Sequence, residues 1–231
     1  MEQLPNGYTL ELAAGCFPLS TDSVLLAHFA RLPRNAAVLD LGSGCGTLGL
    51  LLCAKDANCT VTGLELSENA HEAALKNIQR NDLGCRLNSI CTDLRNLPAE
   101  FTAAFHCCVS NPPYFSGGPA SRSTPHARRD DFCTPAELFQ TASKALRYGG
   151  DFFLVHKPEK LAQLISCGAA VSLEAKNLTL VRHKEGGPIT LILLQFRKGG
   201  KSGLQIHEQS LFDPEGKPTA YYREVYHIQG D

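Results

Sequence analysis

Short apolar runs alternate with amphipathic stretches along most of the chain, and turn residues separate the two kinds of segment. The apolar runs predict strands at residues 36–40, 59–66, 87–91, 105–110 and 151–155. Between them, capping residues and apolar positions at helical spacing predict helices at residues 47–55, 67–81, 134–148 and 158–167. This alternation favours an α/β fold built on a parallel sheet.

The last third of the chain has a different pattern. Two further strands are expected at residues 173–181 and 189–196, and Glu185-Gly186-Gly187-Pro188 between them is typical of a hairpin. After Lys198 the sequence is polar and rich in turn residues, with one short helix expected at residues 221–226.

These elements predict a seven-stranded, mostly parallel sheet with an antiparallel hairpin at its edge. We expect one domain, 1–231, because the sequence contains no internal repeat and no sign of a second domain. Within it, residues 1–34 are expected to form an N-terminal cap segment and residues 199–231 a C-terminal polar extension.

Composition narrows the classes of partner. The net charge is −1, so any contact with nucleic acid must depend on a local basic patch. Ten cysteines are scattered without a Cys-x-x-Cys pair, and the histidines lack zinc-ligand spacing, so we expect no metal. The N-terminus shows no leader pattern and no apolar run approaches a membrane span. We expect a soluble, cytoplasmic protein.

Three carboxylates, Asp40, Glu65 and Asp93, follow successive predicted strands. In an open α/β sheet, ligands bind beyond the carboxyl ends of the strands. The loop Gly42-Ser43-Gly44-Cys45-Gly46 is tighter than the Gly-x-Gly-x-x-Gly pattern of dinucleotide-binding proteins, and Asp40 before it suits a cation better than a phosphate. Glu65 is placed to hold ribose hydroxyls and Asp93 an adenine amino group. The pattern favours S-adenosylmethionine over a nicotinamide or flavin dinucleotide.

The tetrapeptide Asn111-Pro112-Pro113-Tyr114 follows the fourth predicted strand. The exocyclic amine of a base is a poor nucleophile, because its lone pair is delocalised into the ring. The Asn111 amide oxygen and the Pro112 carbonyl, preset by the proline ring, would accept its two hydrogens and favour attack. Tyr114 offers a stacking face worth about 1–3 kcal/mol per base. The alternative is a turn that ends a strand, with Tyr114 as a packing residue.

With these features, the chain resembles class I S-adenosylmethionine-dependent methyltransferases, which have a Rossmann-like fold, along nearly its whole length. Its tetrapeptide is similar to that of amino-methyltransferases acting on adenine N6 or on glutamine of release factors. It most resembles the bacterial tRNA1(Val) N6-adenine methyltransferase family, through residues 17–27, 40–44, 111–114, 152–158 and 221–224.

One stretch departs from the family pattern. Ala127-Arg128-Arg129-Asp130 has Arg129 and Asp130 where the family has His and Glu.

The resemblance implies an enzyme that methylates N6 of an adenine in RNA, a tRNA anticodon loop in particular, with nucleic acid as partner. It assigns the base to Asn111, Pro112, Pro113 and Tyr114. The cofactor residues that it implies are Asp40, Gly42, Ser43, Gly44, Gly46, Glu65, Leu66, Asp93, Leu94 and Asn111, with Phe17, Ser20 and Asp22 closing over the methionine end. Alternatively, Ser20 or Asp22 only caps a helix that begins near Ser23.

Basic residues of the long loop at 115–133 are candidates for phosphate contacts: Arg122, His126, Arg128 and Arg129. Arg197, Lys198 and Lys201 form a second candidate cluster, and for both clusters the alternative is an ordinary solvated surface. Competing functions are a release-factor glutamine methyltransferase, a DNA adenine methyltransferase, a small-molecule methyltransferase and a cofactor-binding scaffold without activity. The first normally carries an extra N-terminal helical domain, whereas about thirty residues precede the first predicted strand here.

Overall fold

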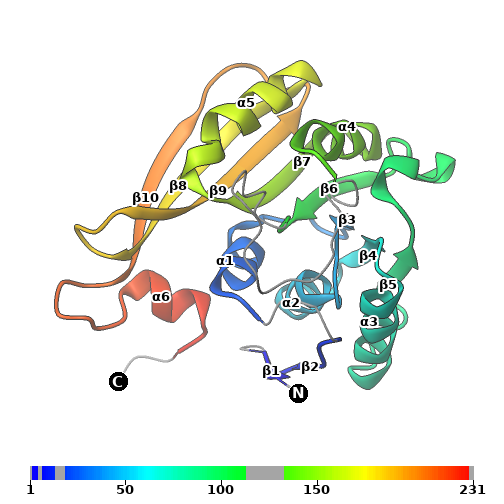
Figure 1. Cartoon of the computed structure of the whole chain (residues 1–231), viewed down its shortest axis with the longest axis horizontal. Helices are drawn as coiled ribbons and strands as arrows, with labels where there is room; N and C mark the ends of the chain where they lie inside the picture. Colours follow the sequence, from blue (N-terminus) through cyan, green and yellow to red (C-terminus); the bar gives the residue numbers. More distant parts are fainter. Residues whose placement is uncertain (1, 5–6, 14–18, 113–132, 229–231) are drawn as a thin grey trace, which may run out of the picture.

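The computed structural model describes residues 2–4, 7–13, 19–112 and 133–228. In this part of the chain, eight strands form one sheet and two short strands form a separate pair (Figure 1). The strands of the sheet are β3 (Ala37–Leu41), β4 (Thr60–Glu65), β5 (Leu87–Cys91), β6 (Phe105–Ser110), β7 (Leu146–His156), β8 (Leu173–Lys184), β9 (Ile189–Lys198) and β10 (Gln205–Phe212). The separate antiparallel pair consists of β1 (Glu2–Gln3) and β2 (Thr9–Leu10).

Helices cover both faces of the sheet (Figure 1). They are α1 (Thr21–Phe29), α2 (Thr47–Lys55), α3 (Glu68–Arg80), α4 (Pro135–Ala145), α5 (Leu161–Ala170) and the short α6 (Ala220–Val225). Apolar side chains of α1, α2 and α3 fill one buried cluster, and those of α4 and α5 fill another on the opposite face. Short 3-10 turns, η1 (Leu94–Asn96), η2 (Ala99–Phe101) and η4 (Pro158–Lys160), lie in the connections.

The strand order is β10-β8-β9-β7-β6-β3-β4-β5. Every neighbouring pair is parallel except the two that include β9, so β9 alone among these strands runs against the others. The predicted hairpin is present as β8 and β9. The α/β class and the mostly parallel sheet are therefore confirmed.

The predicted number of strands, seven, was wrong by one. The eighth strand, β10, lies in the segment that we expected to be a polar extension, and it pairs in parallel with β8. Its first four residues are exposed and only Leu211 is buried, so no apolar alternation marks it in the sequence. Pairing uses backbone groups, which side-chain patterns do not report. The hairpin consequently does not form the edge of the sheet.

The boundary between α4 and β7 also differs from the prediction. The start was correct, because Thr134 and Glu137 form the expected capping box. The helix ends at Ala145, however, and residues 146–150 begin the strand. Leu146 has extended backbone angles and pairs with Phe105 of β6. The Lys198 ammonium donates to the carbonyls of Ser143 and Leu146 at 2.6 and 2.8 Å, which caps the end of the helix.

Two features are absent from the described residues. No helix there combines the length and apolar character needed to cross a membrane. Nor do these residues contain a group of three or more His, Cys, Asp or Glu side chains able to hold a metal ion.

Candidate functional site

The order of strands along the sheet reverses between β3 and β6, which are neighbours although two helices and two strands separate them in the chain. Asp40 of β3 lies opposite Val109 of β6 on one side and Gly63 of β4 on the other. The Ser110 hydroxyl donates to the Leu41 carbonyl at 2.7 Å. The glycine loop after β3 and the Asn-Pro turn after β6 therefore start side by side, where such sheets bind ligands.

The glycine loop owes its shape to left-handed backbone conformations. Gly42, Gly44 and Gly46 have φ angles of 76°, 55° and 84°. A Cβ atom added at Gly42 or Gly44 would meet nothing within 4 Å, so the described residues leave open space beside the loop. These glycines are required by conformation, and they also let a ligand approach the backbone closely.

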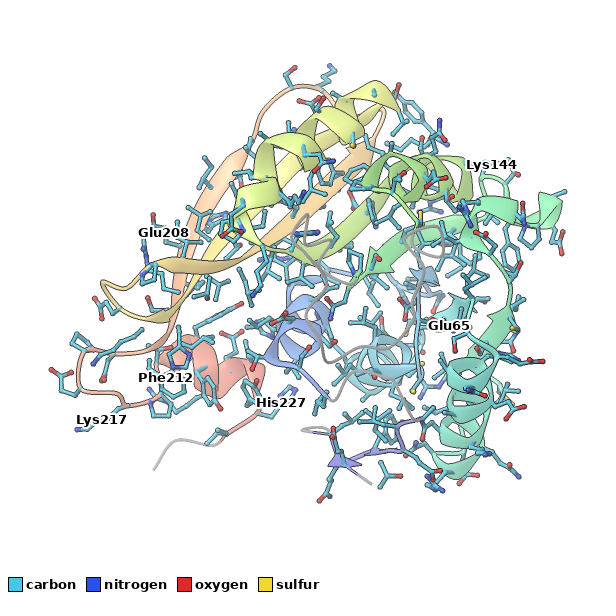
Figure 2. The ribbon with its side chains drawn as sticks, viewed as in Figure 1. Glu65, Lys144, Glu208, Phe212, Lys217 and His227 are labelled. Atoms are coloured by element: carbon cyan, nitrogen blue, oxygen red, sulfur yellow. The ribbon has the colours of Figure 1, made fainter. Side chains whose placement is uncertain are left out.

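Glu65 is held in place at the end of β4, to the right of centre in Figure 2. One carboxylate oxygen accepts from the Gly44 N–H at 2.7 Å, and the other accepts from the Ser67 N–H at 2.8 Å. The carboxylate thus joins the glycine loop to the start of α3. The side chain is only partly buried, and each carboxylate oxygen has a further lone pair beyond the bond that it accepts here.

Asp40 is the most unusual side chain of the site. It is 1% exposed, and neither carboxylate oxygen has a hydrogen-bond partner among the described residues. Burial, with a smaller contribution from the charge of Glu65, raises the pKa of Asp40 to about 8. The buried Ser43 hydroxyl also lacks a partner within the described part of the chain. Buried polar groups are normally satisfied, so these atoms indicate a missing polar or cationic group.

Gly63 was not predicted as a site residue. A Cβ atom there would lie 2.5 Å from the Ser43 hydroxyl oxygen and 2.7 Å from the Ser43 Cβ. Any side chain at position 63 would therefore displace the glycine loop. The signal available in the sequence was a glycine inside a predicted strand, which often marks a close approach of another segment.

Asp93 has a different environment from the other two carboxylates. Its side chain caps η1 through the Arg95 N–H at 2.9 Å and accepts from the Arg95 guanidinium at 2.6–3.0 Å. These hydrogen bonds lower the pKa of Asp93. Its acceptors are thus engaged with Arg95, a residue the sequence did not single out. Leu94 follows in η1, where its carbonyl accepts from Thr141, and the Leu66 side chain is 49% exposed.

The Asn111 carboxamide is fixed by α1. Its Nδ2 donates to the Ser23 hydroxyl at 2.9 Å, a contact between residues 88 positions apart. The bond engages the nitrogen end of the amide and leaves Oδ1, the expected acceptor, out of the contact. Pro112 is buried, and Pro113 and Tyr114 lie outside the described residues.

The N-terminal predictions have a mixed outcome. Ser20 is the N-cap of α1, and its hydroxyl accepts from the Ser23 N–H at 3.4 Å. This agrees with the alternative that Ser20 caps a helix. Asp22 is half-buried, and burial raises its pKa, an effect that the charge of Lys157 partly opposes. Phe17 lies outside the described residues. A role of Ser20 and Asp22 toward the cofactor stays a prediction.

The basic residues divide into two groups. Arg122, His126, Arg128 and Arg129 all lie outside the described residues. In the second cluster, Arg197 forms a two-pronged ion pair with Asp151 at 2.9 Å, and Lys198 caps α4. Two members of that cluster are therefore engaged within the protein.

Comparison with known families decides the class of this site. The family model of the methyltransferase small domain matches residues 20–167, from the cap of α1 into α5. The chain belongs to this methyltransferase family. The match includes the glycine loop, Glu65, Asp93 and Asn111, so the predicted enzyme class and its cofactor, S-adenosylmethionine, are confirmed.

Curated relatives of this methyltransferase support the resemblance stated above. A tRNA1(Val) (adenine(37)-N6)-methyltransferase from Photobacterium profundum is 28% identical, over 87% of this chain and 89% of the relative. One of the same name from Bacteroides fragilis is 30% identical, over 77% of this chain and 76% of the relative. Among solved structures, one titled a predicted O-methyltransferase from Agrobacterium tumefaciens has a TM-score of 0.75 at 20% identity, covering 90% of this chain and 96% of that chain. That structure supports the fold.

Proposed function

We propose that this methyltransferase transfers a methyl group to N6 of an adenine in RNA, in the anticodon loop of a tRNA. The single observation that carries the proposal is the position of Asn111, at the end of β6 and beside the glycine loop, with its amide nitrogen already bound by Ser23. An amide oxygen next to a cofactor site suits an amine substrate. The names of the Photobacterium and Bacteroides relatives point to adenine in tRNA.

The residues present fit S-adenosylmethionine. When bound, it supplies a methyl group on a cationic sulfur. The backbone of the glycine loop, which has open space beside it, would lie against the cofactor. Glu65 has lone pairs for two ribose hydroxyls. Asp40 provides an acidic, unsatisfied pair of oxygens for a cationic ligand. Asp93 would accept from the adenine amino group if its carboxylate shares or leaves its pairing with Arg95.

The chain's own contribution to the reaction is to orient the amine. Asn111 Oδ1 and the Pro112 carbonyl would accept the two amine hydrogens, which favours a pyramidal nitrogen with an available lone pair. Positioning supplies the rest, because a methyl transfer between two bound groups needs no covalent enzyme intermediate. The amine loses its proton after attack, so the site needs no general base.

The preference for RNA follows from the cost of extracting a base. A stacked base must leave its stack, which costs a few kcal/mol and least where it is unpaired. An anticodon loop meets this condition. Tyr114 and the arginines of the loop at 115–133 are the proposed contacts to base and phosphates.

A labelling experiment tests the substrate. The protein is incubated with methyl-labelled cofactor and unfractionated RNA, DNA and protein from a strain that lacks it. Label in the tRNA pool, recovered as N6-methyladenosine after digestion, supports the proposal. Label in protein would indicate a glutamine methyltransferase, and label in DNA would indicate a DNA adenine methyltransferase. Either result would overturn the proposal.

Asn111→Ala tests the role of the amide. We expect methyl transfer to fall about 100-fold or more, the usual loss when a preorganised electrostatic group is removed. Cofactor affinity, measured by calorimetry, should change little, because the acceptor acts on the amine. Asn58→Ala, at an exposed position in the turn before β4, is the matched control and should retain full activity. Retained activity in Asn111→Ala would refute this role.

A further inference from the structure

The hydrogen bond between Ser23 and Asn111 joins the base-binding turn to a helix that precedes the whole sheet. Ser23 is 7% exposed, and its hydroxyl oxygen accepts from Asn111 Nδ2 at 2.9 Å. The backbone N–H of Ser23 donates separately to the Ser20 cap. The side chain of Ser23 is therefore not needed to cap the helix, and its hydroxyl serves the contact with Asn111.

The position of that hydroxyl is fixed from both ends of α1. Ser20 caps the N-terminus, and the Lys55 ammonium donates to the carbonyls of Ala27, His28 and Ala30 at 2.7–2.9 Å around the C-terminus. Thr21, in the first turn, accepts from the Tyr226 hydroxyl at 3.3 Å. Figure 1 shows α6 beside α1. Tyr226 is the residue that directly follows α6.

A carboxamide presents an acceptor at one end and two donors at the other. If Asn111 were turned over, its NH₂ would face the substrate amine, and two donors would oppose each other. A serine hydroxyl can accept from the NH₂ group or donate to the oxygen. In this structure it accepts from Nδ2, so the carboxamide is held with Oδ1 outside the contact before a substrate arrives. We propose that Ser23 is a positioning residue, which acts through Asn111 by holding the carboxamide in place. This inference rests on the proposed function.

The proposal predicts a rate effect without a binding effect. In Ser23→Ala the amide loses its partner and rotates, so we expect single-turnover methyl transfer to fall about tenfold. KM for RNA and for the cofactor should stay within about twofold. Ser23→Thr keeps a hydroxyl and should restore most of the rate. If Ser23 only filled space, the larger threonine would be more damaging than alanine at this buried position.

Two further variants separate positioning from general destabilisation. Ser143→Ala removes a serine hydroxyl that donates to the Val171 carbonyl at 2.8 Å, on α4 and on the other face of the sheet. This control should keep the wild-type rate. In an Asn111→Ala background, Ser23→Ala should cost nothing more, because the group through which it acts is absent. Melting temperatures of all variants are measured alongside.

The outcomes distinguish the two proposals. A wild-type rate in Ser23→Ala, a threonine variant slower than alanine, or a further tenfold loss in the Asn111→Ala background would each overturn the role of Ser23. If label enters protein or DNA instead of RNA, the proposed substrate fails, and the same ratios measured on that substrate decide the role of Ser23. If wild-type protein labels no pool, both proposals fail.

Discussion

The Asp40 side chain combines near-complete burial with the absence of a hydrogen-bond partner among the described residues. Water is excluded and Glu65 is nearby, so the charged form is disfavoured and the pKa rises to about 8. In the ligand-free protein, Asp40 is therefore mostly protonated at neutral pH. A cation bound next to it would favour the carboxylate, so binding is linked to release of a proton.

We predict that cofactor binding near pH 7 releases up to one proton, because the ordinary pKa of Asp40 is 3.8 and its folded value is about 8. Calorimetry in two buffers with different ionisation enthalpies measures that proton. Asp40→Asn should abolish it and weaken binding. Equal binding enthalpies in the two buffers for wild-type protein would refute the linkage.

The raised pKa of Asp40 also makes the free energy of unfolding depend on pH. The contribution of Asp40 is fully present below its ordinary pKa of 3.8 and is lost as the pH rises through about 8. The unfolding free energy of the ligand-free protein should therefore fall across this window relative to that of Asp40→Asn. The limiting slope for one proton is about 1.4 kcal/mol per pH unit. The free energy of unfolding is measured by denaturant titration at several pH values. If it changes with pH in the same way in both proteins, the expectation is contradicted.

At this scale, the sequence allows a prediction for residues whose proposed role follows from local context. Asp40, Glu65 and Asn111 were predicted as site residues because each stands at or just after the end of an apolar run, where parallel strands bring side chains to a ligand. Ser23 was not found, because its partner is 88 positions away and nothing local marks the contact. Arg95 was missed although its partner, Asp93, is only two positions away. A basic residue near a carboxylate is common on any protein surface, so the sequence does not mark this pair as special.

At the scale of elements, α1 supports the candidate site through Ser23, whose hydroxyl binds the Asn111 carboxamide. It packs against α2, β7 and β9, and its last carbonyls are bound by Lys55 from α2. The elements themselves were mostly predictable from apolar period and caps, as the exact ends of α2 and β6 illustrate. Neither β10 nor the early start of β7 was predictable, because both depend on pairing with distant strands.

We predict that Lys55→Met lowers the free energy of unfolding by about 1 kcal/mol, because three helix-end carbonyls lose a charged donor. For a chain of this size, that loss corresponds to a fall of about 2–4 °C in melting temperature. Lys144→Met is the matched control. This exposed lysine lies in the last turn of α4 (Figure 2), and its side chain makes no hydrogen bond found among the described residues. Equal losses in the two variants would remove the case for a specific cap.

At the scale of the whole molecule, the charge balance restricts how the proposed RNA substrate could be held. The net charge is −1, so attraction to phosphates must be local. Arg197 and Lys198 are occupied within the protein, which leaves the arginines of the loop at 115–133 as the stronger candidates. That loop follows the Asn111–Pro112 turn directly in sequence, so contacts there would act next to the base.

We predict that Arg128→Ala combined with Arg129→Ala weakens RNA binding and flattens its dependence on salt. Loss of two phosphate contacts should reduce the slope of log K against log salt by about 1.5. The control replaces Arg34 and Arg147, two exposed arginines. Arg34 precedes β3 and Arg147 lies at the start of β7, so both lie at the amino ends of parallel strands, opposite the carboxyl ends that carry the candidate site. Binding is measured by fluorescence anisotropy at salt concentrations from about 50 mM to about 200 mM. A slope that does not change would exclude the loop as the contact.

The hydrogen bond between the Thr21 and Tyr226 hydroxyls joins residues 205 positions apart. A second contact links the same two segments, because His28 Nε2 of α1 lies 3.6 Å from Glu224 Oε1 of α6. During translation, the ribosome makes α1 among the first segments and α6 among the last. A nascent chain thus contains every residue assigned here to cofactor and base while α1 still lacks one of its supports. A nonsense mutation shortly before α6 would spare all of those residues and still loosen the helix that orients Asn111.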